Sequence, residues 1–189
     1  MNKPLVIQVL HLGHSNLRKI AEQVKDIHAP EVQSVIDNLL ATCAEGGGVG
    51  IAAPQIDEGI RVIVVASNPN PRYPLAPKMA PTPMINPQIV TKSKSMKKDW
   101  EGCLSVPGIR AQVPRHTWIT IVYTDRKGKI KNARYTDFLA RIFQHELDHL
   151  NGVIFLDHAV GREMMAEKEY LKMMNAQMKL HRAQNKKRK

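Results

Sequence analysis

Residues 136–152 constrain the fold more than any other segment of the chain. A helical pattern begins with an N-cap residue, Thr136, stops at Gly152, and carries the run HELDH at positions 145–149. Its apolar positions are Leu139, Ile142, Phe143, Leu147 and Leu150. Because these side chains cover a wide arc of the helix, we expect it to be a central element that is packed on several sides.

Two histidines in this helix, His145 and His149, have the spacing of metal ligands. Positions four apart lie one turn apart on the same face of a helix, so both imidazoles can bind one ion. With Glu146 beside the first histidine, the run matches the H-E-x-x-H pattern of a catalytic metal site with a built-in general base. Burial among apolar side chains would raise the pKa of the Glu146 carboxyl group toward neutrality, as a general base requires.

Cys103, in the segment EGCLS at positions 101–105, is the candidate third ligand. Three protein ligands leave one position of a tetrahedral ion for water, which is typical of a catalytic site rather than a structural one. A structural site would need a fourth ligand, and His11, His116 and His158 stand in no motif that would place them there. A Cys/His site suits several metals, and this chemistry alone would suggest zinc.

The 189 residues are enough for one domain with a sizeable hydrophobic core. Two cysteines give no disulfide framework and favour a reducing compartment, so we expect a cytoplasmic protein. Cys43 lies on the apolar stripe of a predicted helix and is expected to be a small buried side chain. The N-terminal segment is too short and too polar for a secretory signal, and no run approaches the roughly 20 apolar residues of a membrane span.

Hydrophobic spacing divides the rest of the chain into strands and two further helices. One helix begins at Pro30 and stops at 46–48, and the other is expected at about 162–182. Strands are expected at about 61–67, 85–91, 109–113, 117–124 and 129–135, with a hairpin turn at 125–128. The segment 67–84 holds six of the twelve prolines and is predicted to be an irregular or polyproline-like surface loop.

We therefore expect an α+β fold, in which antiparallel sheets pack around the central metal-binding helix and a C-terminal helix follows. Residues 1–160 would form a single catalytic metallohydrolase domain, and residues 161–189 the C-terminal helix with a basic, mobile tail. Residues 170–189 hold seven basic and no acidic residues, whereas 21 basic residues nearly balance 17 acidic ones elsewhere. Such a tail is either simply solvated or binds a polyanion, of which RNA is the one we favour.

Three segments in order, GVGIAAPQ at 48–55, EGCLS at 101–105 and HELDH at 145–149, resemble the motifs of the peptide deformylase family. The resemblance extends from about Val9 to about Phe155. It implies metal-dependent hydrolysis of the N-formyl group from the initiator methionine of nascent polypeptides, with release of formate. It also implies Fe2+ as the physiological metal, which Zn2+ or Ni2+ can replace, in a bacterial-type cytoplasmic enzyme.

The resemblance also assigns catalytic roles. Water bound to the ion would attack the formyl carbon, with Glu146 acting first as general base and then as general acid. The Gln55 side-chain amide and the Leu104 backbone N–H would stabilise the oxyanion that forms. Behind this site, Glu101 and Arg115 are expected to form a buried ion pair, which would be structural rather than catalytic.

The substrate peptide would add as an extended strand between the first two motifs, according to the same resemblance. Gly50 allows a close approach of the two backbones, and Ile51 and Gly102 would offer backbone hydrogen bonds. Ile51 and Ile142 are candidates for the wall of the methionine pocket, although each could simply be a core residue. Arg110 corresponds to an arginine of the family that lies near the peptide.

Three other functions remain open from the sequence. A zincin-type endopeptidase shares H-E-x-x-H but takes its third ligand downstream, as His or Glu, so Cys103 argues against it. An inactive homologue that only binds peptide or ribosome would lack Glu146 or a ligand. A nucleic-acid-binding module could use the basic tail at 170–189, and as an addition to the enzyme this tail would dock on ribosomal RNA.

Overall fold

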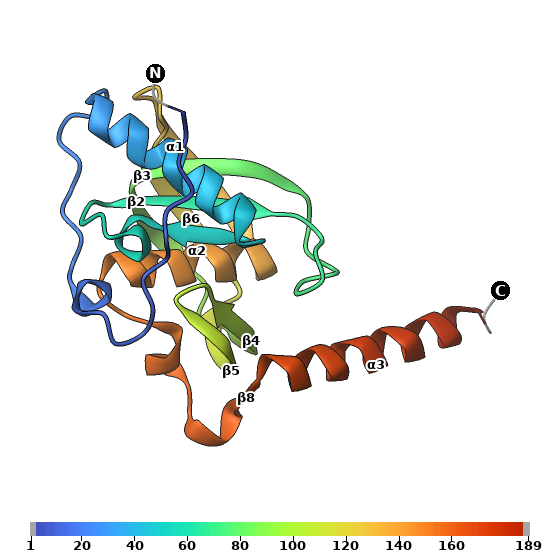
Figure 1. Ribbon diagram of the computed structural model, residues 1–189. Coiled ribbons are helices and arrows are strands. Elements are labelled where there is room, and N and C mark those ends of the chain that lie inside the picture. Colours follow the sequence, from blue (N-terminus) through green and yellow to red (C-terminus); the bar gives the residue numbers. More distant parts are fainter. Residues whose placement is uncertain (1–2, 187–189) are drawn as a thin grey trace.

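Two helices enclose a five-stranded antiparallel sheet, and a three-stranded antiparallel sheet covers the other side of the second helix (Figure 1). The computed structural model describes the backbone of residues 3–186 and the side chains of residues 3–179. The strands are β1 (Gly50–Ala52), β2 (Val62–Ser67), β3 (Met79–Lys92), β4 (Met96–Cys103), β5 (Val106–His116), β6 (Trp118–Thr124), β7 (Ile130–Thr136) and β8 (Met164–Ala166). The helices described are α1 (Pro30–Glu45), α2 (Asp137–Leu150) and α3 (Glu167–Lys186), with 3-10 turns at Ser15–Arg18, Ala53–Ile56, Phe155–His158 and Gly161–Glu163. The predicted α+β fold is confirmed.

Helix α1 lies across one face of the five-stranded sheet, whose strand order is β1-β2-β3-β6-β7 (Figure 1). It begins at Pro30, where a missing N–H breaks no helical hydrogen bond, and it ends before Gly46, as predicted. The side chains of Ile36 and Leu39 are fully buried in a core that α1 shares with β1 and β2. Cys43 lies in the same core, which confirms its predicted burial.

Helix α2 is the central element of the molecule, as the sequence predicts. Nine of its fourteen residues are buried, and they face both the five-stranded sheet and β5 of the smaller sheet, whose order is β4-β5-β8. The helix follows Thr136, the predicted N-cap residue, and Gly152 lies just beyond its end with a φ of +71°. Glycine adopts this left-handed conformation at little cost, which suits it to a helix end.

Strands β6 and β7 form the predicted hairpin. Their pairing is antiparallel and continuous from Trp118 opposite Thr136 to Thr124 opposite Ile130. The turn is closed by a hydrogen bond of 3.0 Å from the Gly128 N–H to the Asp125 carbonyl. The turn residues therefore have the role that their sequence predicts.

The prediction of an irregular loop over 67–84 is wrong in its second part, because β3 already begins at Met79. Pro81 and Pro83 lie within this strand, and Pro83 is paired with Val64 of β2. Pairing of β3 with its other neighbour, β6, starts only at Ile85. The prolines therefore occupy a stretch of β3 with one unpaired edge, where a missing N–H donor is tolerated.

The C-terminal helix begins later than predicted. Residues 162–166 form the end of a 3-10 turn and then β8, which pairs with β5 through Ala166 opposite Ile109. Helix α3 starts at Glu167 and extends away from the body of the molecule (Figure 1). Residues 187–189 of the predicted basic tail lie outside the described residues, and both the mobility of the tail and the domain boundary at residue 160 stay predictions. Among the described residues, no helix is both long and apolar enough to span a membrane.

Candidate metal centre

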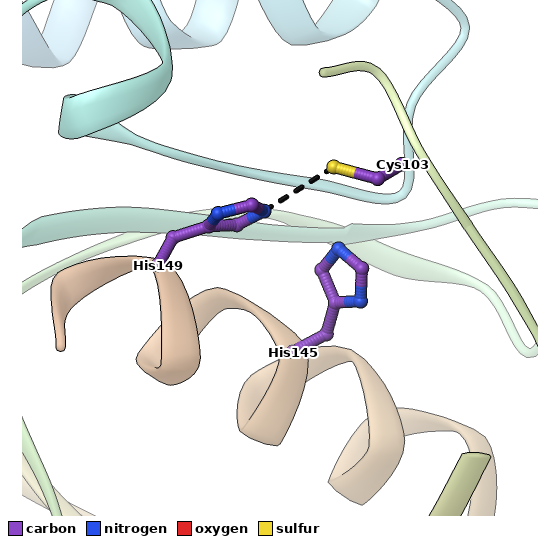
Figure 2. A group of neighbouring side chains, drawn as sticks. All are labelled: Cys103, His145 and His149. Atoms are coloured by element: carbon purple, nitrogen blue, oxygen red, sulfur yellow. Dashed lines mark hydrogen bonds between the residues drawn. The ribbon is translucent and has the colours of Figure 1, made fainter. Parts of the chain in front are cut away.

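The structure brings Cys103, His145 and His149 together, although β4 and α2 are far apart in sequence. One potential ligand atom from each residue lies within 4.8 Å of the others. Figure 2 shows both imidazoles projecting from the same side of α2 toward the Cys103 sulfur. The Cys103 Sγ and His149 Nε2 atoms are 3.3 Å apart.

Cys103 reaches this position because the β4–β5 ladder is irregular at its closed end. The register shifts between Glu101 and Cys103, and Cys103 then pairs with Val106 across a tight turn. Within the turn, the Ser105 N–H donates to the Cys103 sulfur over 3.4 Å. A shift of this kind re-aims a side chain that would otherwise follow the pleat of the strand.

The side chains around Cys103 favour the thiolate form of this residue over the thiol. Burial opposes ionisation, but the adjacent His149 and His145 side chains hold the pKa of the Cys103 thiol well below its usual range. A thiolate is the form in which cysteine binds a metal ion. Together with two imidazoles, it makes a donor set that suits Zn, Fe or Ni.

His145 is oriented by a buried carboxylate, Glu101. The Nδ1 atom of His145 lies 2.9 Å from Glu101 Oε2, which leaves Nε2 as the free ring nitrogen. Arg115 forms the expected buried ion pair with Glu101, with Nε 2.9 Å from Oε1, and Arg141 Nη1 donates to the same oxygen over 2.7 Å. Although burial opposes ionisation, the bonds from His145 and Arg115 keep the pKa of Glu101 well below its usual value. A carboxylate behind a metal-binding histidine fixes the ring and its tautomer.

Glu146 is buried beside these ligands and is 4% exposed. Burial raises the pKa of its carboxyl group to about 7. Its Oε2 atom has no hydrogen-bond partner among the described residues. A buried carboxylate normally has its oxygens satisfied, so this oxygen is available for a bound ion, a water molecule or a substrate. The residues present therefore fit a site for one metal ion with a general base beside it.

Gln55 approaches the same site from the turn after β1. Its Oε1 accepts the Ala52 N–H over 2.9 Å, and its Nε2 donates to Ser105 Oγ over 3.0 Å and to Cys103 Sγ over 3.4 Å. Because the carbonyl oxygen is already bonded, the amide NH2 group must face the Cys103 side. Ser105, which holds this NH2 group, belongs to the EGCLS motif, but its role was not predicted from the sequence.

The N-terminal segment ties together the two chain segments that carry Gln55 and Ser105. The Leu10 N–H donates to the Gln55 carbonyl, and the Leu12 N–H donates to the Ser105 carbonyl, both over 2.8 Å. No motif in residues 3–14 signals this contact, since only backbone groups take part. The segment thus fixes the spacing between the Gln55 turn and the Cys103 loop.

A cleft leads from this centre to the molecular surface. The cleft is lined by Glu101, His145 and Glu146 of the centre, and also by the predicted substrate-side residues Gly50, Gly102, Leu104, Arg110 and Ile142. Ile51 does not line it. Its side chain is fully buried in the core beneath α1, so it does not wall a methionine pocket and only its backbone could face a substrate.

The outer part of the cleft is built by segments that the sequence did not predict to be there. Arg72 and Tyr73, from the proline-rich segment, line it together with Trp100 of β4 and Glu167 of α3. The proline-rich segment and the C-terminal helix therefore both contribute to the site. Their sequences contain no motif that would indicate this.

Comparison with known proteins gives one consistent result. The sequence profile of the family described as polypeptide deformylase matches residues 6–165. Peptide deformylase 2 of Nostoc sp. (strain PCC 7120) is 49% identical over 177 residues, which cover 93% of this chain and 99% of that protein. Peptide deformylase 2 of Shewanella oneidensis is 42% identical over 158 residues, which cover 84% of this chain and 86% of that protein. Among solved structures, the Met-Ala-Ser-bound class I type b peptide deformylase from Acinetobacter baumannii is similar with a TM-score of 0.79 and 42% identity, over 82% of this chain and 98% of that one.

Proposed function

The chain belongs to the peptide deformylase family, and from this membership we propose that it removes the formyl group from formyl-methionine at the start of nascent peptides. Enzymes of this family are metal-dependent hydrolases, and they act on nascent peptides. The observation that carries the proposal is the meeting of Cys103, His145 and His149 next to the buried Glu146. The Acinetobacter baumannii relative, whose structure holds Met-Ala-Ser, supports a peptide that begins with methionine as the ligand.

Glu146 is the proposed general base. A metal ion held by Cys103, His145 and His149 would supply Lewis acidity, which polarises a carbonyl group and makes water easier to deprotonate. The Oε2 atom of Glu146, which has no partner in the described part of the chain, accepts the proton of the attacking water. The same carboxyl group then delivers that proton to the departing amine. With a pKa of about 7, the group can hold and release this proton near neutral pH.

Gln55 and Leu104 are the proposed oxyanion donors. The Gln55 NH2 group is held on the Cys103 side by the bond to Ser105, so it needs little reorganisation when charge develops on the formyl oxygen. Leu104 follows Cys103 directly in the turn and lines the cleft, where its backbone N–H is the second donor. Two donors fixed before the reaction are the arrangement that stabilises a tetrahedral oxyanion.

The peptide is proposed to bind as an extended strand between Gly50 and Gly102, with backbone hydrogen bonds at Ile51 and Gly102. Both glycines line the cleft, and β1 and β4 are edge strands of their sheets. A side chain at Gly50 would collide with Glu146, so glycine is required there by the catalytic carboxylate. Arg110 packs directly against Gly102 and is proposed to support this part of the peptide.

The decisive experiment is formate release from a formyl-Met-Ala-Ser peptide. Protein prepared anaerobically with Fe2+ is expected to release formate, and Glu146→Ala is expected to keep its bound metal but lose about 10²–10⁴-fold in rate. Absence of formate release by the native protein at matched metal content would refute the proposed function. We propose Fe2+ as the metal in the cell, with Zn2+ or Ni2+ as substitutes, and metal analysis of anaerobically purified protein tests this.

The basic C-terminal segment is proposed to contact ribosomal RNA, which would place the cytoplasmic enzyme near emerging chains. Helix α3 extends away from the body, and residues 170–189 hold seven basic residues and no acidic ones. Removal of residues 180–189 is expected to weaken ribosome binding and to flatten its salt dependence, without changing turnover of a short peptide. Equal ribosome binding by both proteins across a salt series would refute this part of the proposal.

A further inference from the structure

The outer end of the cleft carries a cluster of charged and aromatic side chains that the catalytic mechanism does not use. We call Arg72, Tyr73, Arg110 and Glu167 the outer cluster. All four line the cleft, and they come from the proline-rich segment, β5 and the first residue of α3. Glu167 lies beyond residue 165, where the match to the family profile ends. The cluster therefore extends beyond the part of the chain that the family profile matches.

Arg110 is held in place within the cluster by one carboxylate and two aromatic side chains. Its Nε and Nη2 atoms donate to Glu167 Oε1 over 3.2 and 2.7 Å, and its Nη1 donates to the Tyr73 hydroxyl over 2.6 Å. The guanidinium carbon lies 4.9 Å from the ring centroids of both Tyr73 and Tyr170. A Cβ on Gly102 would come within 2.7 Å of this guanidinium, so Arg110 lies against the backbone that is proposed to bind the peptide.

Arg72 is the second cation of the cluster and is more open. Its side chain is 39% exposed, its Nη1 donates to the Gly46 carbonyl over 3.2 Å, and its Nε lies 3.5 Å from Glu167 Oε1. The guanidinium groups of Arg72 and Arg110 thus share the Glu167 carboxylate, and of the two only Arg110 is buried. The outer cluster therefore carries a net positive charge, and Arg72 is the group that can still accept an anionic partner.

We propose that Arg72 and Glu167 set a charge preference for the peptide residues that follow methionine, favouring acidic over basic side chains. This inference rests on the proposed function, because it assumes that the peptide runs along the cleft from the metal centre. Arg72 would pair directly with a substrate carboxylate. Glu167 is a specificity residue with the opposite effect, since its carboxylate competes for Arg72 and repels an acidic substrate.

The test compares kcat/KM for formyl-methionyl tripeptides that carry Glu, Gln or Lys at the second or third position. The native enzyme is expected to prefer Glu over Lys at one of these positions by about threefold to tenfold, and the preference is expected to shrink at high salt. Arg72→Gln should bring the Glu/Lys ratio close to one, whereas Arg72→Lys should retain most of the preference. Glu167→Gln should raise the ratio, because it leaves both cations unopposed.

Lys129, exposed in the β6–β7 turn and absent from the cleft lining, provides a matched control. Lys129→Gln removes one positive charge like Arg72→Gln, but it should leave the Glu/Lys ratio unchanged. If the variants lower kcat/KM equally for all three peptides, the two residues are merely structural and the inference is wrong. Equal ratios in every protein would also overturn it, whereas absence of formate release from the uncharged Gln peptide would refute the proposed function itself.

Discussion

Substitution of Gly50 by alanine should disable the enzyme by moving one carboxylate. A Cβ at this position would lie 2.9 Å from the Cγ and Cδ atoms of Glu146 and closer still to its Oε1. The favourable separation of two non-bonded carbon atoms is about 3.5–4.0 Å, so the Glu146 side chain must move by about 1 Å. The φ of Gly50 lies outside the left-handed region, so alanine adds no backbone strain there.

Gly50→Ala is expected to lower the catalytic rate and to leave the free energy of unfolding nearly unchanged. A displacement of about 1 Å in a catalytic group typically lowers the rate about 10²-fold. This corresponds to about 2.7 kcal/mol of transition-state stabilisation, within the range that a general base contributes. Because the colliding atoms belong to a flexible side chain, the free energy of unfolding should change by less than about 1 kcal/mol, and the three ligands should retain their metal.

The assay is formate release with metal content measured in parallel. Gly59→Ala is the matched control, since a Cβ at Gly59 would meet nothing within 4 Å, and it should have native activity. The combination of Gly50→Ala with Glu146→Ala separates this explanation from a lost contact between Gly50 and the peptide. If alanine at Gly50 acts through Glu146, it should cost little more in the Glu146→Ala background. Independent, additive losses would refute the reasoning.

Three further predictions follow from the core, the buried charges and the oxyanion donors. Leu39→Ala removes a fully buried side chain and should lower the free energy of unfolding by about 2–5 kcal/mol in urea, whereas Leu75→Ala, at a side chain that is 84% exposed, should change it by less than about 0.5 kcal/mol. Arg115→Met leaves Glu101 short of a buried partner and should cost about 3 kcal/mol by the same measurement, so a loss below about 1 kcal/mol would contradict the assigned role. Gln55→Leu should lower kcat about 10²–10³-fold with little change in KM, and full turnover by this variant would show that Gln55 is not an oxyanion donor.

The features that the sequence predicts correctly are those that depend on residues close together in the chain. The central helix and its two histidines follow from the interval of four residues and from apolar positions on several sides. The β6–β7 hairpin follows from its turn residues. Strand β4 was missed because Met96–Asp99 are all exposed and the strand pairs only with β5 in the described structure, so it lacks the apolar alternation of a half-buried strand.

Apart from the buried pair of Glu101 and Arg115, the supporting residues of the site could not be predicted, because their partners are distant in sequence. Ser105 holds Gln55 across 50 positions, and Arg141 bonds Glu101 across 40. A serine and an arginine are ordinary surface residues by composition, and only the fold shows that both are buried. Glu167 is a similar case, since the sequence predicts only that it lies within the C-terminal helix, whereas the structure places it in the cleft.

The buried charges around Glu101 offer a reason why the metal ligands meet correctly. Apolar packing alone tolerates small slides of the β4–β5 sheet against α2, because hydrophobic contact has little directionality. Glu101, on β4, must face His145 and Arg141 of α2 and Arg115 of β5 at once, and Arg115 also reaches Asp148 of α2 over 2.5 Å. Any slide would leave a buried charge without its partner, at a cost of several kcal/mol. We infer that this network fixes the register of β4 on α2, and that the position of Cys103, two residues after Glu101, is set by the same constraint.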